Sequence, residues 1–228
     1  MNLAQRIMMA RRMGSAPEAP EPYWDDVVLL LKGDGAHGST DIIDYSQEGH
    51  SLSVTGTTSL STEKTKFGFS SILFDRSGGV RLPVSSSLTL TNDFTIECWA
   101  SGGGQYGTFI GDMPGTTYIE TGYARGAFIR LGGTHAGYTP FDPNDGLWTN
   151  YTLTREGGAI KLFLDGVQRV TLSSANVFDL SGGWVGVSGQ GAAYSFDGYI
   201  AELRVTKGVA RYTTNFTPPT APFPTTGP

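Results

Sequence analysis

The chain has 228 residues, of which 39% are apolar and only 16% are charged, so it can bury a substantial core. Its net charge of −5 disfavours nucleic acid as a partner, because that binding requires a clustered cationic surface. Its 32 glycines predict many strands joined by tight turns, and no stretch approaches the ~20 apolar residues of a membrane span, so we expect no membrane partner.

Residues 1–13 differ from the rest of the chain in composition. They hold four of the five methionines, three arginines and no acidic residue, with apolar residues spaced as one helical stripe. Methionine adapts to irregular surfaces, so this cationic, apolar segment suits docking on another molecule, although a frayed and solvated terminus is the alternative. The segment is predicted to be an attachment arm with contact residues Leu3, Ile7, Met8, Arg11 and Arg12.

Four regions follow from the composition. Residues 1–13 form the arm, 14–22 a Pro/Ala linker, 23–212 a single β domain and 213–228 a proline-rich tail. The tail cannot join a central sheet and is expected to run extended over a surface. Arginines interrupt the apolar stretch that a signal peptide would need, and Cys98 is the only cysteine, so we expect folding in a reducing cytoplasm.

The middle region is a succession of short predicted strands. Residues 26–32, DVVLLLK, form a continuous apolar run typical of a strand covered on both faces. In 94–100, FTIECWA, alternation places Phe94, Ile96 and Cys98 on one face and Glu97 and Trp99 on the other. The segments IKLFL and VQRV flank Asp-Gly, the strongest short hairpin signal, and the strands WVGVSG and YIAELRVT close the set. We expect helix only in the arm and at most in 208–212.

The ordered blocks resemble a known family. The runs YWDDVVLLLKGDG, KFGFSSILFDRSGGVRLP, DFTIECWA, GLWTNYTLTREGGAIKLFLDGV and FDGYIAELRVTKGVARYTTNFTPPTAPFP look like the concanavalin A-like, laminin-G-type domain of tailed-bacteriophage structural proteins. The resemblance spans roughly residues 23–224. It implies an all-β, concanavalin A-like jelly-roll sandwich of two antiparallel sheets, here with a short N-terminal helical or extended arm. It does not fix a function, because this fold carries sugar binders, hydrolases and inert spacers.

Catalytic signals are weak. Glycoside hydrolysis needs two carboxylates, and the E-x-D-x-E strand of the lectin-fold glucanases is absent. Glu97 and Glu202 lie on predicted strands, where a salt bridge to Arg204 or another basic residue explains a buried glutamate better than catalysis. The G-x-G-x-x-G match at 102–107 precedes TFIGD, which is predicted to be a strand rather than the helix of a dinucleotide site. We therefore expect no enzyme.

Metal and cofactor signals are equally weak. Calcium needs six to eight oxygen ligands, and the aspartates of two Gly/Pro-rich loops could supply some of them, yet the same composition is required by ordinary turns. The three histidines are isolated and lack metal-ligand spacing. We predict no metal and no cofactor. The residues concerned are Asp112, Asp142, Asp145, His37, His50 and His135.

A sugar site would combine exposed aromatic faces with polar groups that orient the ligand. Tyr106, Tyr118 and Tyr123 lie in the stretch 101–146, which departs most from the family pattern, and they are the candidate glycan-binding residues. Packing or subunit contact is the alternative for them. Trp148 and Trp184 open strands and are assigned to the core or its edge.

Three functions remain open from the sequence. The first is a non-enzymatic virion structural protein, a capsid decoration or tail-fibre component, synthesised in the host cytoplasm and attached to other virion proteins by its arm. The second is a module that binds host surface glycans, and the third is a glycan hydrolase. The first is favoured by the apolar arm and the cytoplasmic chemistry, and a homo-oligomer is expected.

Overall fold

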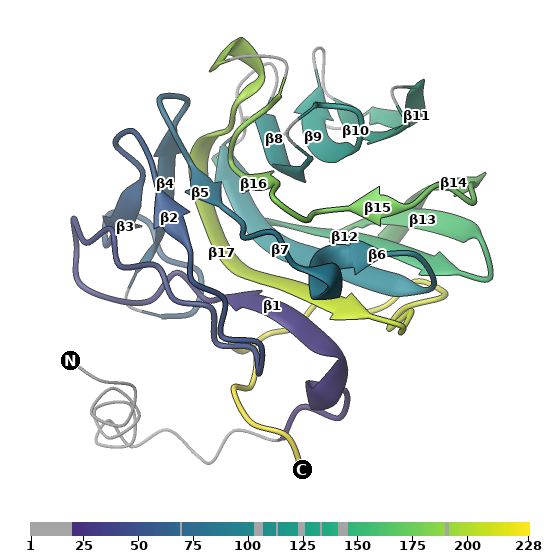
Figure 1. Ribbon diagram of the computed structural model, residues 1–228, viewed down its shortest axis with the longest axis horizontal. Helices are drawn as coiled ribbons and strands as arrows, with labels where there is room; N and C mark the ends of the chain where they lie inside the picture. Colours follow the sequence, from purple (N-terminus) through teal and green to yellow (C-terminus); the bar gives the residue numbers. More distant parts are fainter. Residues whose placement is uncertain are drawn as a thin grey trace.

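The computed structural model describes residues 20–228 except 69, 103–106, 113, 123–125, 133, 141–145 and 190–191, and it describes only the backbone of 121, 122, 126 and 134–140. The chain forms two antiparallel sheets that face each other across one core (Figure 1). The predicted architecture, a sandwich of two antiparallel sheets, is confirmed. No helix in the described residues could span a membrane.

Sheet A is built around its long strand β17, and β1 pairs with β17 beside the main strand order (Figure 1). Its strands, in spatial order, are β14 (Val167–Ser173), β13 (Ala159–Leu164), β12 (Thr149–Glu156), β7 (Phe94–Gly102), β17 (Asp197–Lys207), β4 (Ser71–Asp75) and β3 (Ser59–Ser61), with β1 (Val27–Leu31) beside β17.

Sheet B covers the other side of the core. Its strands, in spatial order, are β11 (Thr134–Pro140), β10 (Gly126–Leu131), β9 (Tyr118–Gly122), β8 (Gly107–Gly111), β16 (Trp184–Val185), β5 (Val80–Arg81) and β2 (Ser53–Val54). The small pair β6 (Thr89–Leu90) and β15 (Phe178–Asp179) and the 3₁₀ turns η1 (Trp24–Asp26), η2 (Ser86–Leu88) and η3 (Ala192–Tyr194) complete the described elements.

Two predicted strands have the faces that their sequences indicate. All five residues of β1 are buried, because Leu29 and Leu31 face the main core while Val27 and Leu30 pack on the opposite side. In β7, alternate residues Phe94, Ile96 and Cys98 belong to the core. Burial raises the pKa of the Cys98 thiol, as does the neighbouring Glu97, so the thiol stays protonated inside the sandwich.

The predicted hairpin is also confirmed. Asp165 and Gly166 join β13 to β14 with φ values of 49° and 73°, the double positive φ of a type I′ turn. Gly166 has a second reason to lack a side chain, since a Cβ would lie 1.9 Å from the carbonyl oxygen of Phe216 in the tail. The turn therefore also provides a contact surface for the C-terminal segment.

The outer face of sheet A carries a buried ion cluster. Arg204 on β17 donates from Nη2 to Glu97 Oε1 on β7 at 2.8 Å and pairs through Nη1 with Glu21. Arg211 donates to Glu21 Oε1 at 2.7 Å, and the Tyr212 hydroxyl donates to Glu97 Oε2 at 3.3 Å. The predicted salt bridge between Glu97 and Arg204 is confirmed, and the cluster ties the start of the domain to the segment after β17.

The C-terminal segment packs on this outer face. Phe223 is 3% exposed and joins Val27 and Leu30 in a second apolar cluster, with the Arg204 guanidinium 3.6 Å from its ring centroid. Its N–H donates to Glu202 Oε2 at 2.8 Å. Glu202 sits at an irregularity of the β17–β7 register with φ of 53°, a strained conformation that directs its carboxylate to the tail. Residues 208–212 form no helix, contrary to the possibility raised above.

Candidate ligand-binding face

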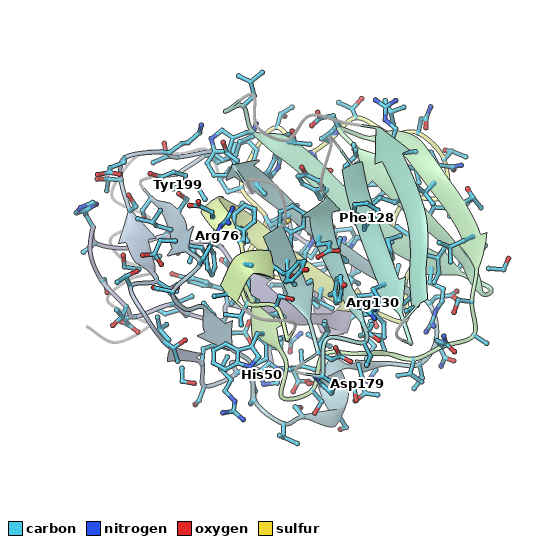
Figure 2. The ribbon with its side chains drawn as sticks, turned by 90° about the horizontal axis from the view of Figure 1, so that it is seen from above. His50, Arg76, Phe128, Arg130, Asp179 and Tyr199 are labelled. Carbon is cyan, nitrogen blue, oxygen red and sulfur yellow. The ribbon has the colours of Figure 1, made fainter. Side chains whose placement is uncertain are left out.

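The register of β8, β9 and β10 gathers polar and aromatic side chains on one surface. Tyr118 pairs with Arg130 and Glu120 with Phe128 across β9 and β10. Ile119, between Tyr118 and Glu120 on β9, is buried in the core. Because successive residues of a strand point to opposite faces, the four paired side chains point away from sheet A. Figure 2 looks onto the strands at the top of Figure 1 and shows Phe128 and Arg130 on this side.

A cross-strand row continues the surface toward the other sheet edge. Tyr118 pairs with Gly111 on β8, which pairs with Trp184 on β16, which pairs with Arg81 on β5. A Cβ on Gly111 would lie 2.5 Å from the Cβ of Tyr118, so glycine is required beside the tyrosine. Arg81 is exposed, and its guanidinium carbon lies 5.7 Å from the centroid of the half-buried Trp184 ring. We call the surface formed by these side chains the β8–β10 face. Its members are Arg81, Thr108, Tyr118, Glu120, Phe128, Arg130 and Trp184.

Tyr118 lies beneath Arg130. It is 1% exposed, and Arg130 Nη1 donates to its hydroxyl oxygen at 3.1 Å with the guanidinium carbon 5.6 Å from the ring centroid. Burial raises the pKa of Tyr118 to about 12, and the carboxylate of Glu120 acts in the same direction. The hydroxyl therefore stays protonated and helps to hold the guanidinium in place.

Glu120 is the unusual acid of this face. It is 2% exposed, and burial raises its pKa to about 7, outweighing the opposing effects of Arg130 and of the Tyr118 hydroxyl. An ordinary surface glutamate, in contrast, is fully ionised at neutral pH. Carboxyl groups whose pKa is shifted this far are common at functional sites.

Several polar atoms of the face lack partners. Within the described residues, four of the nine buried side-chain polar atoms that make no hydrogen bond lie here. Folded proteins satisfy most such groups, because an unpaired buried donor or acceptor costs about 1–3 kcal/mol. Their concentration on one sheet surface makes this face the candidate site. They are Thr108 Oγ1, Glu120 Oε2, Arg130 Nε and Trp184 Nε1.

The three tyrosines predicted to bind sugar fall in different places. Tyr118 lies on this face, but its buried ring offers no stacking surface, so that part of the prediction needs correction. Tyr106 directly precedes β8 and Tyr123 directly follows β9, and both lie outside the described residues. Phe128 is the half-exposed ring of the face and was not among the candidates. The alternation in AFIRL was the signal that could have identified it.

The remaining residues singled out in the sequence lie away from the β8–β10 face, on that face, or outside the described part of the chain. Neither Glu97 nor Glu202 is a free carboxylate, since one pairs with Arg204 and the other accepts from the Phe223 backbone. The segment after the G-x-G-x-x-G match is strand β8, as predicted. Trp148 and Trp184 are both half-buried. The arm residues Leu3, Ile7, Met8, Arg11 and Arg12 lie outside the described part of the chain.

The loop aspartate that the structure describes is part of a turn. Asp112 accepts from the backbone N–H groups of Thr116 and Thr117 at 2.7 and 3.0 Å, whereas Asp142 and Asp145 lie outside the described residues. Among the residues that the structure covers, no group of three or more potential ligands is arranged to hold a metal ion. His37 contacts Thr62 and His50 contacts Ser87, and the His135 side chain is not described.

The raised pKa of Glu120 predicts a pH dependence of stability. In the unfolded chain this group releases its proton near its ordinary pKa of 4.5, whereas in the folded protein it holds the proton to about 7. The stabilisation that comes from the protonated Glu120 is therefore fully present below pH 4.5 and is lost as the pH rises through 7. Over this range the free energy of unfolding should fall by roughly 1–3 kcal/mol. Urea denaturation at several pH values checks this, and Glu120→Gln should flatten the profile between pH 4.5 and 7. An unchanged profile in that variant would contradict the assignment.

Comparison with known proteins identifies the family. Residues 74–211 match the sequence model of the concanavalin A-like lectin/glucanases superfamily. The chain belongs to this superfamily. The predicted concanavalin A-like fold is thereby confirmed. No curated protein matches this chain.

Solved structures agree on the fold. Domain 4 of an extracellular arabinanase from Geobacillus stearothermophilus, in complex with arabinotriose, has a TM-score of 0.56 and 16% identity over 80% of this chain and 93% of its own. The binding domain of botulinum neurotoxin DC, in complex with SialylT, has a TM-score of 0.59 and 14% identity over 82% and 49%. A Trypanosoma rangeli sialidase mutant has a TM-score of 0.55 and 14% identity over 90% and 33%. At these identities the similarity shows the shared fold.

Proposed function

We propose that this superfamily member is a non-catalytic module that binds glycans on its β8–β10 face. The observation that carries the proposal is the set of unpartnered buried polar atoms on that face, next to the half-exposed ring of Phe128. Sugars match such a surface, because their C–H faces stack on aromatic rings and their hydroxyl groups both donate and accept hydrogen bonds.

The comparisons support the proposal at the level of the fold. Two of the similar structures are complexes, one with arabinotriose and the other with SialylT. The same architecture therefore accommodates saccharide ligands in other proteins, and the β8–β10 face is where the residues of this chain provide suitable chemistry.

A binding role is preferred to hydrolysis because of the carboxylates. Retaining and inverting glycosidases generally use two carboxyl groups on either side of the scissile bond. Among the described residues, the two cross-strand rows of this face contain one carboxylate, Glu120, while Glu97 is neutralised by Arg204 on the opposite sheet. We expect no release of reducing ends from bacterial polysaccharides, and release that Glu120→Gln abolishes would make the protein a hydrolase.

The binding test uses two matched phenylalanine variants. On a glycan array, Phe128→Ala should lose binding, whereas Phe67→Ala should retain it. Phe67 is also half-buried but packs against Trp99 on sheet A, at a ring distance of 5.7 Å. Equal loss in both variants would indicate general destabilisation, and the absence of any array signal with the unmodified protein would overturn the proposal.

We also propose that the module is a structural component of a virion, attached by residues 1–13 to other virion proteins. This rests on the resemblance to tailed-phage structural proteins and on the cationic, methionine-rich composition of the arm. Assembly into a homo-oligomer belongs to the same proposal. Many copies on a particle would strengthen weak glycan binding through multivalency.

Arm deletion tests this second proposal. The deletion must stop at residue 19, because Glu21 is buried in ion pairs with Arg204 and Arg211 and its loss would destabilise the sandwich. The truncated protein should fold and remain soluble but fail to enter particles. Incorporation at wild-type occupancy would show that another segment is the anchor.

A further inference from the structure

Building on the proposed glycan-binding function, we infer that the β8–β10 face selects acidic sugars, whose carboxylate group pairs with Arg130. The guanidinium is planar and presents its N–H donors in a geometry that matches a carboxylate. Arg130 lies next to Phe128 on the same face of β10, so one ligand can contact the ring and the charge together.

The arrangement of charges on the face carries the inference. Along its cross-strand rows the described cations are Arg81 and Arg130, and the described anion is Glu120. The chain as a whole has a net charge of −5, so a surface on which cations outnumber anions differs from its average. A ligand that carries a negative charge is favoured here over a neutral or cationic one.

Arg130 and Glu120 do not satisfy each other. Arg130 Nε and Glu120 Oε2 make no hydrogen bond within the described structure, although the two groups lie close enough to interact electrostatically. The Tyr118 hydroxyl accepts a hydrogen bond from Arg130 Nη1 at 3.1 Å and so holds the guanidinium in place. An arginine that is held in place and still has an unpaired donor is prepared to bind an anion.

Protonation of Glu120 strengthens this selectivity. The titratable and charged groups that act on Glu120 are Tyr118 on its own strand and Arg130 on β10, while Tyr194 from η3 acts on Tyr118. With a pKa of about 7, Glu120 is largely neutral in mildly acidic solution, and the charge of Arg130 is then unopposed. Acidic sugars should therefore bind more tightly at pH 5.5 than at pH 8.

The test compares acidic oligosaccharides with their carboxyl-reduced counterparts, which differ only in the charged group. The reduced forms should bind the unmodified protein about ten-fold more weakly or worse, as expected for the loss of one charge-assisted hydrogen bond. Arg130→Gln should lose the same factor for the acidic forms only. Arg169→Gln, an exposed arginine on β14 of sheet A, should bind as the unmodified protein does.

The outcomes separate the selectivity for acidic sugars from the glycan-binding function on which it rests. Equal binding of acidic and reduced sugars would overturn the inference and leave the glycan-binding function intact, whereas no binding of either would overturn the function itself. The pH arm gives a second measurement. Glu120→Gln, which imitates the protonated acid, should bind acidic sugars equally well at pH 5.5 and pH 8, and a retained pH dependence would exclude Glu120 as its cause.

Discussion

Arg204→Met is expected to destabilise the protein by about 3–5 kcal/mol, a large part of the 5–15 kcal/mol stability of a typical domain. Arg204 is 4% exposed and pairs with two buried carboxylates, Glu21 and Glu97. Burial alone would raise the pKa of Glu21, but Arg204 and Arg211 hold it below its usual value. Without Arg204, a negative charge remains buried without full compensation, which is the costly state.

A double-mutant cycle separates this cause from lost packing. Glu97→Gln removes one buried negative charge without changing shape, so the pair Glu97→Gln and Arg204→Met should cost less than the sum of the single changes. The matched control is Arg169→Met on the exposed side of β14, which should change the free energy of unfolding by no more than about 0.5 kcal/mol. Urea denaturation measures all four variants, and simple additivity would refute the electrostatic explanation.

Phe223→Ala is expected to cost about 3–5 kcal/mol, the usual range for a buried phenylalanine. The ring fills the cluster of Val27 and Leu30 and lies against the Arg204 guanidinium, so its removal leaves a cavity beside the ion cluster. The tail should then detach, because its anchoring contacts at Glu202 and Lys32 depend on the position of this residue.

Limited proteolysis and urea denaturation together test the role of Phe223. Phe223→Leu, which keeps most of the volume, should be much milder, and Val84→Ala at a position that is 86% exposed should have no effect. If Phe223→Ala resembles the Val84 variant, the tail is not an integral part of the sandwich.

Local patterns predicted the strands well. The apolar run of β1, the alternation of β7 and the Asp-Gly hairpin each depend on neighbouring residues, and for these segments sequence periodicity is sufficient. A salt bridge of Glu97 to Arg204 or another basic residue could also be expected, because a glutamate in an apolar strand needs a compensating charge, and the structure shows that the partner is Arg204.

Long-range features could not be predicted in the same way. Phe223 packs on β1, which lies about 190 residues earlier in the chain, and nothing local to a proline-rich tail indicates that contact. The irregular register at Glu202 reverses which side chain faces the tail. The candidate face required the register of β8, β9 and β10, because Glu120 and Arg130 meet only once the strands are aligned.

The two ends of the described chain lie together and far from the candidate face. Glu21 N–H donates to the Thr226 carbonyl, and in Figure 1 this region is at the bottom whereas β8–β10 are at the top. Any support joined to residues 20–22 would therefore leave the β8–β10 face directed outward. The same spacing gives a practical rule for labelling: a fluorophore or bead attached through residue 20 lies away from the β8–β10 face, where we propose that glycans bind, and so leaves that face open.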